Sequence, residues 1–146
     1  MNKTISELSI KIRKPNIGII GLGYVGLPLA IEFSKKYEVI GFDKNKKRVE
    51  NLSKGYDHTN EVSSNELKKA KLIFTSNKKI ISNCNVFIVT VPTPVDKSKR
   101  PDLGPLKSAS TLIGHFLKKG DLVIYESTVY PGATDEQCVP ILEKVS

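Results

Sequence analysis

The chain has 146 residues, of which 39% are hydrophobic and 26% are charged. This length favours one domain, and this composition excludes disordered, collagen-like and disulfide-dense proteins. The 23 basic and 15 acidic residues give a net charge of +8, which suits a polyanionic partner or a phosphate-bearing ligand without distinguishing them. The two cysteines, Cys84 and Cys138, have no CxxC or metal-ligand spacing, so we predict no disulfide framework and no metal site.

The uncharged run from Ile17 to Ile31 is the segment that most resembles a signal peptide or a membrane span. It is shorter than the roughly 18 residues that a span requires, and it contains four glycines and a proline. Residues 32–36, which follow it, form no small-residue cleavage site. We therefore predict no targeting segment there, and the use of cysteine favours a cytoplasmic protein.

Short apolar runs alternate with longer amphipathic stretches, which is typical of strands and helices around a parallel sheet. The runs predict five strands, at residues 17–20, 39–42, 72–74, 86–91 and 122–125. Most of these runs are apolar throughout, as expected for strands that are covered on both faces. The predicted fold class is α/β, a doubly wound parallel sheet of the Rossmann type. A sixth strand would have to follow Ser146, so we expect the amino-terminal part of a longer protein, although a five-stranded domain can be complete.

Two helices are predicted from their apolar spacing, within a domain at residues 15–146 that follows a basic leader at residues 1–14. The first helix is predicted to end at residues 118–120, because two lysines and a glycine suit a helix C-terminus. Its apolar side comprises Leu106, Ala109, Ile113, Phe116 and Leu117. The last helix is predicted to begin with Thr134 and Gln137 in a capping box and to bury Cys138 in the core.

The strongest local motif is Gly21-Leu22-Gly23-Tyr24-Val25-Gly26, which directly follows the first predicted strand and precedes a helical pattern. A GxGxxG motif is a weak signal alone, but this context is the one that dinucleotide binding requires. Gly21 permits a tight turn, Gly23 lets the backbone approach a pyrophosphate, and Gly26 lets the helix pack closely on the strand. The helix N-terminus then favours the anion, and Pro28 suits its first turn.

Asp43 ends the second predicted strand, 22 residues after Gly21. This interval is close to that of the acid that binds the adenosine ribose in dinucleotide-binding proteins. Its charge favours NAD over NADP, because it would repel a 2′-phosphate. The neighbouring cations, Lys44, Lys46, Lys47 and Arg48, could instead accept that phosphate. Asp43 could also simply cap a turn or a helix before Lys46.

Two more segments follow predicted strands, at residues 92–94 and 126–132. Ligands of open α/β sheets bind at this edge, so Thr93 and Thr128 could contact a cofactor or a catalytic water. Alternatively, Thr93 only orders a turn between prolines, and Ser127 or Thr128 caps the next helix. Glu126 could be a buried acid or base, although we favour an ordinary acid near the sheet edge. Neither cysteine has a recognisable base partner, so both are interpreted as packing residues.

Together these stretches resemble the amino-terminal domain of the NAD-dependent nucleotide-sugar dehydrogenases, the UDP-glucose and GDP-mannose 6-dehydrogenase family. The likeness covers nearly the whole chain and rests on IGIIGLGYVGLPLA, GFD with Arg48 five residues later, VTVPTPVDKSKRPDL and ESTVYPGAT. The forms VPTPVDKSKRPDL and ESTVYPGAT look most like the branch that oxidises UDP-N-acetylhexosamines for bacterial surface polysaccharides.

The resemblance implies that NAD contacts Val25, Asp43, Arg48, Thr93 and Thr128. It also implies that Thr128 helps to position a catalytic water, as the one residue here that contributes to catalysis. The predicted cofactor-binding residues are Gly21, Leu22, Gly23, Tyr24, Val25, Gly26, Asp43, Arg48, Pro92, Thr93, Ser127 and Thr128.

The resemblance further implies an oxidoreductase that oxidises the C6 alcohol of a UDP-hexose to the uronate with two NAD, through an aldehyde and a cysteine-linked thioester. The family's catalytic cysteine lies in a downstream glycine-rich motif, which neither Cys84 nor Cys138 matches. We therefore expect the chain alone to be inactive, because central helical and UDP-sugar-binding domains are absent from it. We expect a parent protein that is a homodimer or higher oligomer, with no nucleic-acid or membrane partner. The alternatives are a non-catalytic NAD-sensing or nucleic-acid-binding domain and, less in keeping with the motifs, a methyltransferase.

Overall fold

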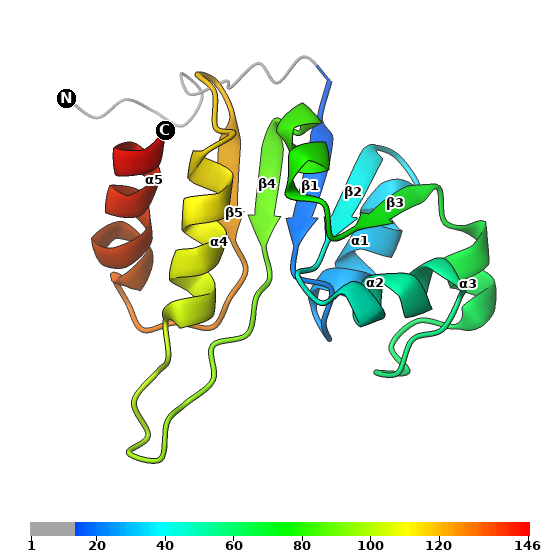
Figure 1. The fold of residues 1–146 in the computed structure, drawn as a ribbon, viewed down its shortest axis with the longest axis horizontal. Coiled ribbons are helices and arrows are strands. Elements are labelled where there is room, and N and C mark those ends of the chain that lie inside the picture. The colour runs from blue at the N-terminus through cyan, green and yellow to red at the C-terminus, as the bar shows by residue number, and fades with distance from the viewer. Residues whose placement is uncertain (1–13) are drawn as a thin grey trace.

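The structure is a computed structural model that describes residues 14–146, so the predicted leader lies outside the described residues except for Lys14. Five parallel strands form one sheet in the order β3-β2-β1-β4-β5 (Figure 1). They are β1 (Asn16–Ile20), β2 (Glu38–Phe42), β3 (Leu72–Thr75), β4 (Val86–Val89) and β5 (Leu122–Tyr125). The predicted fold class, with its five strands, is confirmed.

Helices cover both faces of the sheet (Figure 1). The α-helices are α1 (Gly26–Ser34), α2 (Lys46–Ser53), α3 (Ser64–Lys69), α4 (Gly104–Gly114) and α5 (Val139–Val145). A 3₁₀ helix, η2 (Lys78–Asn83), precedes β4, and a π-helical turn, η3 (Thr134–Cys138), leads into α5. The helices α1, α2 and α3 pack on one face, and η2, α4 and α5 pack on the other. None of the helices within residues 14–146 is long and apolar enough to span a bilayer.

The central strands β1, after its first residue Asn16, and β4 have no polar side chain, because each must fill two cores. In β1, Ile17 and Ile19 belong to the core beneath α1, whereas Ile20 belongs to the core beneath α4 and α5. In β4, Ile88 and Phe87 divide between the two cores in the same way. Successive side chains of a strand point to opposite faces, so a strand between two helical layers has no polar side.

The order of the strands places a crevice beside the carboxyl ends of β1 and β4. The chain runs from β1 outward to β2 and β3, then returns past β1 to β4 and continues to β5. The connections therefore leave β1 and β4 in opposite directions, which opens the sheet edge between them. The glycine-rich turn follows β1, and residues 90–94 follow β4, so two predicted site segments meet at this crevice.

Strand β4 is shorter than predicted and ends at Val89 instead of at residue 91. Its neighbour β1 ends at Ile20, where the chain turns away at Gly21, and its other neighbour β5 ends at Tyr125, opposite Val89. Residues after Val89 therefore have no strand to pair with. The amide of Thr90 still donates to the Ile20 carbonyl at 2.9 Å. Pro92, which lacks an amide hydrogen, could not have continued the ladder.

Two predicted helix boundaries are wrong. Helix α4 ends at Gly114, and the chain then forms a turn in which the amides of Phe116 and Leu117 donate to the Ile113 carbonyl. The capping box predicted at Thr134 and Gln137 does not form, because Thr134 already lies inside η3 and Ala133 occupies the N-cap without a side-chain bond.

A capping box occurs instead at the start of α3. The Ser63 hydroxyl accepts from the Glu66 amide at 3.2 Å, and the Glu66 carboxylate accepts from the Ser63 amide at 2.9 Å. This pair satisfies two amides that the first turn of the helix leaves without intrahelical acceptors. A capping box therefore forms at Ser63, where the spacing of serine and glutamate falls at the start of a helix.

The two isoleucines at positions 19 and 73 offer a matched test of the core. Ile19 in β1 is 0% exposed, whereas Ile73 in the edge strand β3 is 55% exposed. We expect Ile19→Val to lower the free energy of unfolding by about 0.5–1.5 kcal/mol, because it removes one buried methylene. The same change at Ile73 should alter it by less than about 0.5 kcal/mol. Urea unfolding of both variants measures the difference, and equal losses would contradict the described packing.

Candidate functional site

Gly21 makes the sharp turn at the end of β1. Its φ of +104° lies in the left-handed region, and a Cβ there would come within 3.1 Å of the Thr90 backbone. Its amide donates to the Phe42 carbonyl at 2.8 Å, which ties the turn to the end of β2. Only glycine adopts this conformation without strain, so the role predicted for Gly21 in the turn agrees with the structure.

Gly26, at the start of α1, permits the close approach of helix and turn. A Cβ on Gly26 would collide with the carbonyl oxygen of Gly21 and with Oγ1 of Thr90. That threonine is buried, and its hydroxyl donates to the Gly21 carbonyl at 2.7 Å. Sequence reasoning missed Thr90, for which the only signal was a threonine at the end of an otherwise apolar strand.

Gly23 differs from these two glycines because nothing in the protein requires it. No atom of residues 14–146, chain neighbours aside, lies within 4 Å of the place where its Cβ would be. Its carbonyl accepts from the Leu27 amide at 3.2 Å, so it stands at the N-terminus of α1. A side chain here would fill open space just before the first turn of α1. The absence of a side chain suits a ligand that approaches this backbone.

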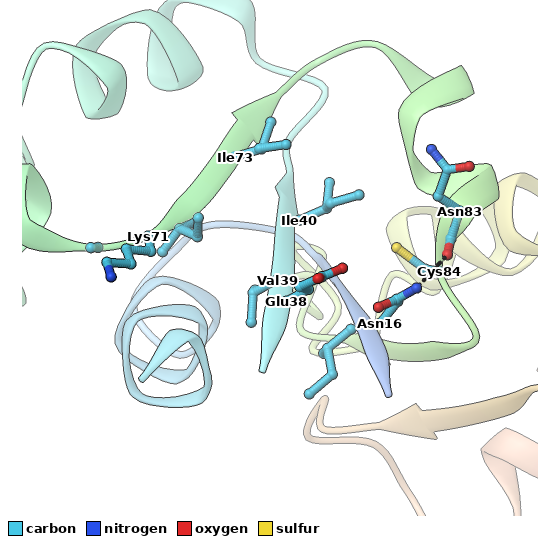
Figure 2. Close-up of a pocket in the computed structure, with 11 residues that line it drawn as sticks. Asn16, Glu38, Val39, Ile40, Lys71, Ile73, Asn83 and Cys84 are labelled. Carbon is cyan, nitrogen blue, oxygen red and sulfur yellow. Dashed lines mark hydrogen bonds between the residues drawn. The ribbon is translucent and has the colours of Figure 1, made fainter. Parts of the chain in front are cut away.

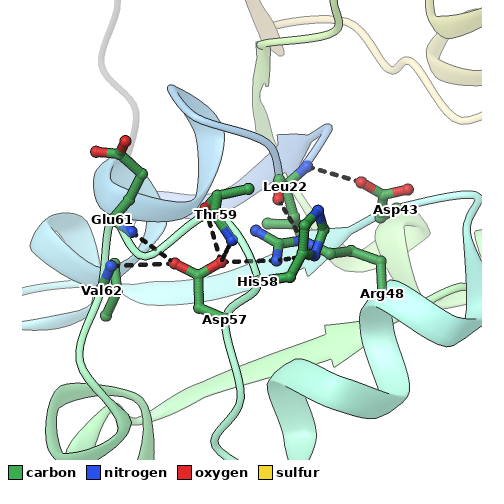
Figure 3. Close-up of polar contacts among 8 residues, drawn as sticks. All are labelled: Leu22, Asp43, Arg48, Asp57, His58, Thr59, Glu61 and Val62. Atoms are coloured by element: carbon green, nitrogen blue, oxygen red, sulfur yellow. Dashed lines mark hydrogen bonds and ion pairs between the residues drawn. The ribbon is translucent and has the colours of Figure 1, made fainter.

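The Asp43 carboxylate binds the backbone amide of Leu22 (Figure 3). Its Oδ2 accepts from the Leu22 amide at 2.9 Å, and its Oδ1 accepts from the Asn45 amide at 2.9 Å. Of the alternative roles, the helix cap is wrong, since the N-cap of α2 is Asn45, whereas the turn cap is confirmed by the bond from the Asn45 amide. Each carboxylate oxygen can accept more than one hydrogen bond, so Asp43 retains capacity for ligand hydroxyls.

Arg48, in the first turn of α2, binds the backbone carbonyl of Leu22 (Figure 3). Its Nε donates to the Leu22 carbonyl at 2.8 Å, and its Nη1 donates to Oδ1 of Asp57 at 2.7 Å. Nη1 also lies 3.1 Å from Nδ1 of His58. Nη2 is buried and has no hydrogen-bond partner in the described part of the chain. The contact of Arg48 with NAD stays a prediction.

Asp57 is the partner that sequence reasoning did not find. Besides Arg48, it accepts hydrogen bonds from its own loop, namely from the amides of Thr59, Glu61 and Val62 and from the Thr59 hydroxyl. Burial would raise the pKa of this carboxyl, but the donors from Thr59, Arg48 and Val62 outweigh it and hold the pKa well below its usual range. Asp57 is therefore a fixed, ionised counter-charge for Arg48.

The residues after β4 and β5 approach one another at the same edge of the sheet. The hydroxyl of Ser127 donates to the Val91 carbonyl at 2.8 Å, which joins the two loops. Ser127 and Thr128 do not cap a helix, since the next helical turn starts at Thr134. Thr128 and Glu126 are exposed, which excludes the buried acid or base considered for Glu126. Oγ1 of Thr93 is buried and without a hydrogen-bond partner within residues 14–146.

A cavity of about 210 Å³ lies between the end of β2, the segment after β4 and helix α4. It adjoins both Gly21 and Asp43, and its lining is mostly apolar. Pro92, Pro105 and Leu112 contribute apolar surface, which suits a flat aromatic ring. A dinucleotide fits the residues of this cavity, because an apolar place for adenine, the carboxylate of Asp43 as a ribose acceptor and the glycine-rich turn at Gly21 adjoin it.

A larger cavity, about 730 Å³, lies elsewhere, beside the amino ends of β1 and β2 (Figure 2). It is lined by Asn16, Glu38, Lys71 and Cys84 among others, and ligands of parallel sheets bind at the opposite edge. Burial, with a smaller contribution from Asp121, raises the pKa of the Cys84 thiol to about 11. Cys138 is fully buried, so the prediction that both cysteines are packing residues is confirmed. Within residues 14–146 no group of three potential metal ligands occurs.

The contrast between Gly26 and Gly23 generates a stability prediction. We expect Gly26→Ala to lower the free energy of unfolding by at least about 1–3 kcal/mol, because its methyl group has no room. Gly23→Ala should change it by less than about 0.5 kcal/mol, because its methyl group enters open space. Thermal unfolding of the two variants checks this, and an equal loss at both positions would show that the turn is packed differently.

The ionised state of Asp57 generates a pH prediction. A carboxyl whose pKa is lower in the folded chain than in the unfolded chain stabilises the fold above the unfolded pKa, about 3.9. That stabilisation is lost as the pH falls through the folded pKa. We expect the Asp57 carboxyl carbon to show the ionised form by NMR down to about pH 3, and Asp57→Asn to be less stable than wild type at pH 7. Protonation of Asp57 near pH 4 would contradict the geometry.

Comparisons with known proteins show which family the chain resembles. Residues 15–146 match the family model of the UDP-glucose/GDP-mannose dehydrogenase family, NAD binding domain. The chain is 62% identical over 131 residues to UDP-N-acetyl-D-glucosamine 6-dehydrogenase of Pseudomonas aeruginosa, covering 89% of this chain and 31% of that protein. It is 54% identical over 136 residues to the enzyme of the same name from Salmonella typhi, covering 92% and 32%. The chain thus spans about a third of the length of these relatives.

Solved structures show the same likeness. UDP-D-ManNAc dehydrogenase from Pyrococcus horikoshii matches with a TM-score of 0.81 at 34% identity, over 88% of this chain and 32% of that one. GDP-mannose dehydrogenase from Pseudomonas aeruginosa, in a ternary complex, matches with a TM-score of 0.81 at 28% identity, over 90% and 32%. The resemblance inferred from the motifs is confirmed, including its N-acetylhexosamine branch. The chain belongs to the UDP-glucose/GDP-mannose dehydrogenase family and corresponds to its NAD-binding domain.

Proposed function

We propose that the chain is the cofactor-binding part of a UDP-N-acetylhexosamine 6-dehydrogenase. The observation that carries this proposal is the glycine-rich turn, in which Asp43 and Arg48 hold the two peptide groups of Leu22 while Gly23 faces open space. The names of the relatives from Pseudomonas aeruginosa and Salmonella typhi support the substrate class. NAD, when bound, supplies the acceptor for the hydride from the sugar alcohol.

The residues of the chain bind and orient that cofactor. The backbone of the turn at Gly23, Tyr24 and Val25, which leads into the N-terminus of α1, receives the pyrophosphate. The Asp43 carboxylate accepts hydrogen bonds from the hydroxyls of the adenosine ribose, and the cavity beside Pro92 holds the adenine. Thr93 and Thr128 supply hydroxyls at the carboxyl ends of β4 and β5, where Thr128 helps to position the water that completes the oxidation.

The preference for NAD over NADP follows from the charges at the end of β2. Asp43 would lie beside a 2′-phosphate and repel it. Of the four cations considered above, Arg48 is buried and paired with Asp57, while Lys44, Lys46 and Lys47 are exposed. The charges of exposed lysines are screened by solvent, so their attraction for a 2′-phosphate offsets its repulsion by Asp43 only weakly.

The parent protein oxidises the C6 alcohol of the sugar twice, consuming two NAD and one water to give the uronate for surface polysaccharides. The nucleophilic cysteine, and most contacts to the UDP-sugar, come from parts of the parent outside this chain. We place the parent in the cytoplasm, as a homodimer or higher oligomer, without nucleic-acid or membrane partners. Nothing observed here favours the NAD-sensing or nucleic-acid-binding alternative.

Calorimetric titration with NAD and with NADP tests the cofactor preference. Wild type should bind NAD more tightly, and Asp43→Asn should lose that preference several-fold, since the carboxylate charge is what repels the 2′-phosphate. Asparagine is preferable to alanine because its carbonyl still accepts from the Leu22 amide. Asp121→Asn, at the opposite edge of the sheet, is the charge-matched control and should leave the preference unchanged.

Two further readouts separate binding from turnover. Gly23→Ala should weaken NAD binding while leaving the fold intact, because its methyl group occupies the space of the pyrophosphate. With NAD and a UDP-N-acetylhexosamine, the chain should produce no absorbance at the wavelength of NADH. A folded chain that binds neither dinucleotide would overturn the proposed function, and turnover would overturn the assignment of the nucleophile to another part of the parent.

A further inference from the structure

A buried ion pair joins the glycine-rich turn to a loop that has no place in the motif. Arg48 and Asp57 are nine residues apart and have 4% and 1% of their side chains exposed. Arg48 bonds to the Leu22 carbonyl, and Asp57 is held by the amides of its own loop, residues 57–62. The position of the Leu22 carbonyl therefore depends on a carboxylate 35 residues further along the chain.

Asp57 is built to hold one orientation. Its Oδ1 accepts from the Thr59 amide at 2.9 Å and from the Thr59 hydroxyl at 2.7 Å, in addition to Arg48. Its Oδ2 accepts from the amides of Glu61 and Val62 at 2.9 and 3.1 Å. With five donors, the carboxylate cannot turn away without leaving several of them unsatisfied in a buried place. The Arg48 guanidinium therefore binds a carboxylate whose position and orientation are fixed.

The orientation of the Arg48 side chain affects the relative affinity of the site for NAD and NADP. In dinucleotide-binding folds, an arginine near the acid at the end of the second strand can accommodate the 2′-phosphate of NADP. Arg48 stands five residues after Asp43, but Leu22 and Asp57 occupy its Nε and Nη1. Its charge is compensated by Asp57, so little of it would act on an additional phosphate.

We propose that Asp57 is a positioning and specificity-determining residue of the cofactor site. Through Arg48 it fixes the Leu22 carbonyl in the turn, and by retaining and neutralising that guanidinium it disfavours NADP. The proposal rests on the proposed binding of NAD by this chain. A purely structural ion pair would support the turn for both dinucleotides equally, so the ratio of the two affinities distinguishes the two roles.

The test is calorimetric titration of wild type and Asp57→Asn with NAD and NADP at one salt concentration. Asparagine removes the charge and keeps most of the shape of the side chain. We expect NAD to bind more weakly and the ratio of affinities to shift toward NADP by about tenfold, the order expected when one uncompensated charge acts on a phosphate at an effective dielectric of about 20. Asp57→Glu, which retains the charge, should restore most of the preference for NAD.

A variant of Arg48 tests whether the effect of Asp57 on the affinity ratio passes through the guanidinium. In an Arg48→Met background, Asp57→Asn should leave the ratio unchanged, because no guanidinium remains to be released. If circular dichroism shows that Asp57→Asn does not fold, Asp57→Ser replaces it, since a serine hydroxyl can still accept from the Thr59 amide and leaves room for water.

The outcomes separate this inference from the function on which it rests. Wild type that binds neither dinucleotide overturns the proposed function and this inference together. Wild type that prefers NAD, combined with a charge-removing variant at position 57 that keeps the same ratio, overturns the inference alone. A shifted ratio that persists in the Arg48→Met background would also overturn it, because the effect would then not pass through Arg48.

Discussion

The site depends on how the backbone of one residue, Leu22, is held. Its amide donates to the Asp43 carboxylate, and its carbonyl accepts from the Arg48 guanidinium (Figure 3). Charged groups form stronger hydrogen bonds than neutral ones, so both peptide groups of this residue are held firmly. The side chain of Leu22 is fully buried, which anchors it from a third direction. A turn fixed in this way presents the amides of α1 to an anion without having to be ordered when the anion binds.

The fold could be predicted because its signals are local and repeated. Apolar runs identified all five strands, and β5 was predicted at its observed bounds, Leu122–Tyr125. Where the prediction failed, the cause was tertiary. Strand β4 ends early because its neighbour β1 turns away at Gly21, and no property of the segment Val86 to Val91 announces this. The capping box at Thr134 failed because the spacing does not show where the helix begins.

The site was predictable in part, for an equally physical reason. The glycine-rich turn and the acid that follows it stand in a fixed local pattern, so Gly21, Gly23, Gly26 and Asp43 could be identified from spacing. Residues that hold that pattern in place can come from anywhere in the chain that the fold brings near. Thr90 reaches the Gly21 carbonyl from the segment just after β4, and Asp57 reaches Arg48 from a loop. A single aspartate in a polar loop gives no indication in the sequence that its carboxylate will be buried.

The buried pair also explains why the basic character of the chain does not determine its site. Most of the 23 basic residues contribute to an overall positive charge, which attracts any polyanion over a distance but selects none. Arg48 is different, because burial removes it from solvent and its partner fixes its direction. Breaking such a pair by removing one partner leaves an uncompensated buried charge, which costs about 3–5 kcal/mol. A guanidinium under that constraint acts as part of the framework of the turn, so the selectivity of the crevice is set by which charges are compensated and not by how many are present.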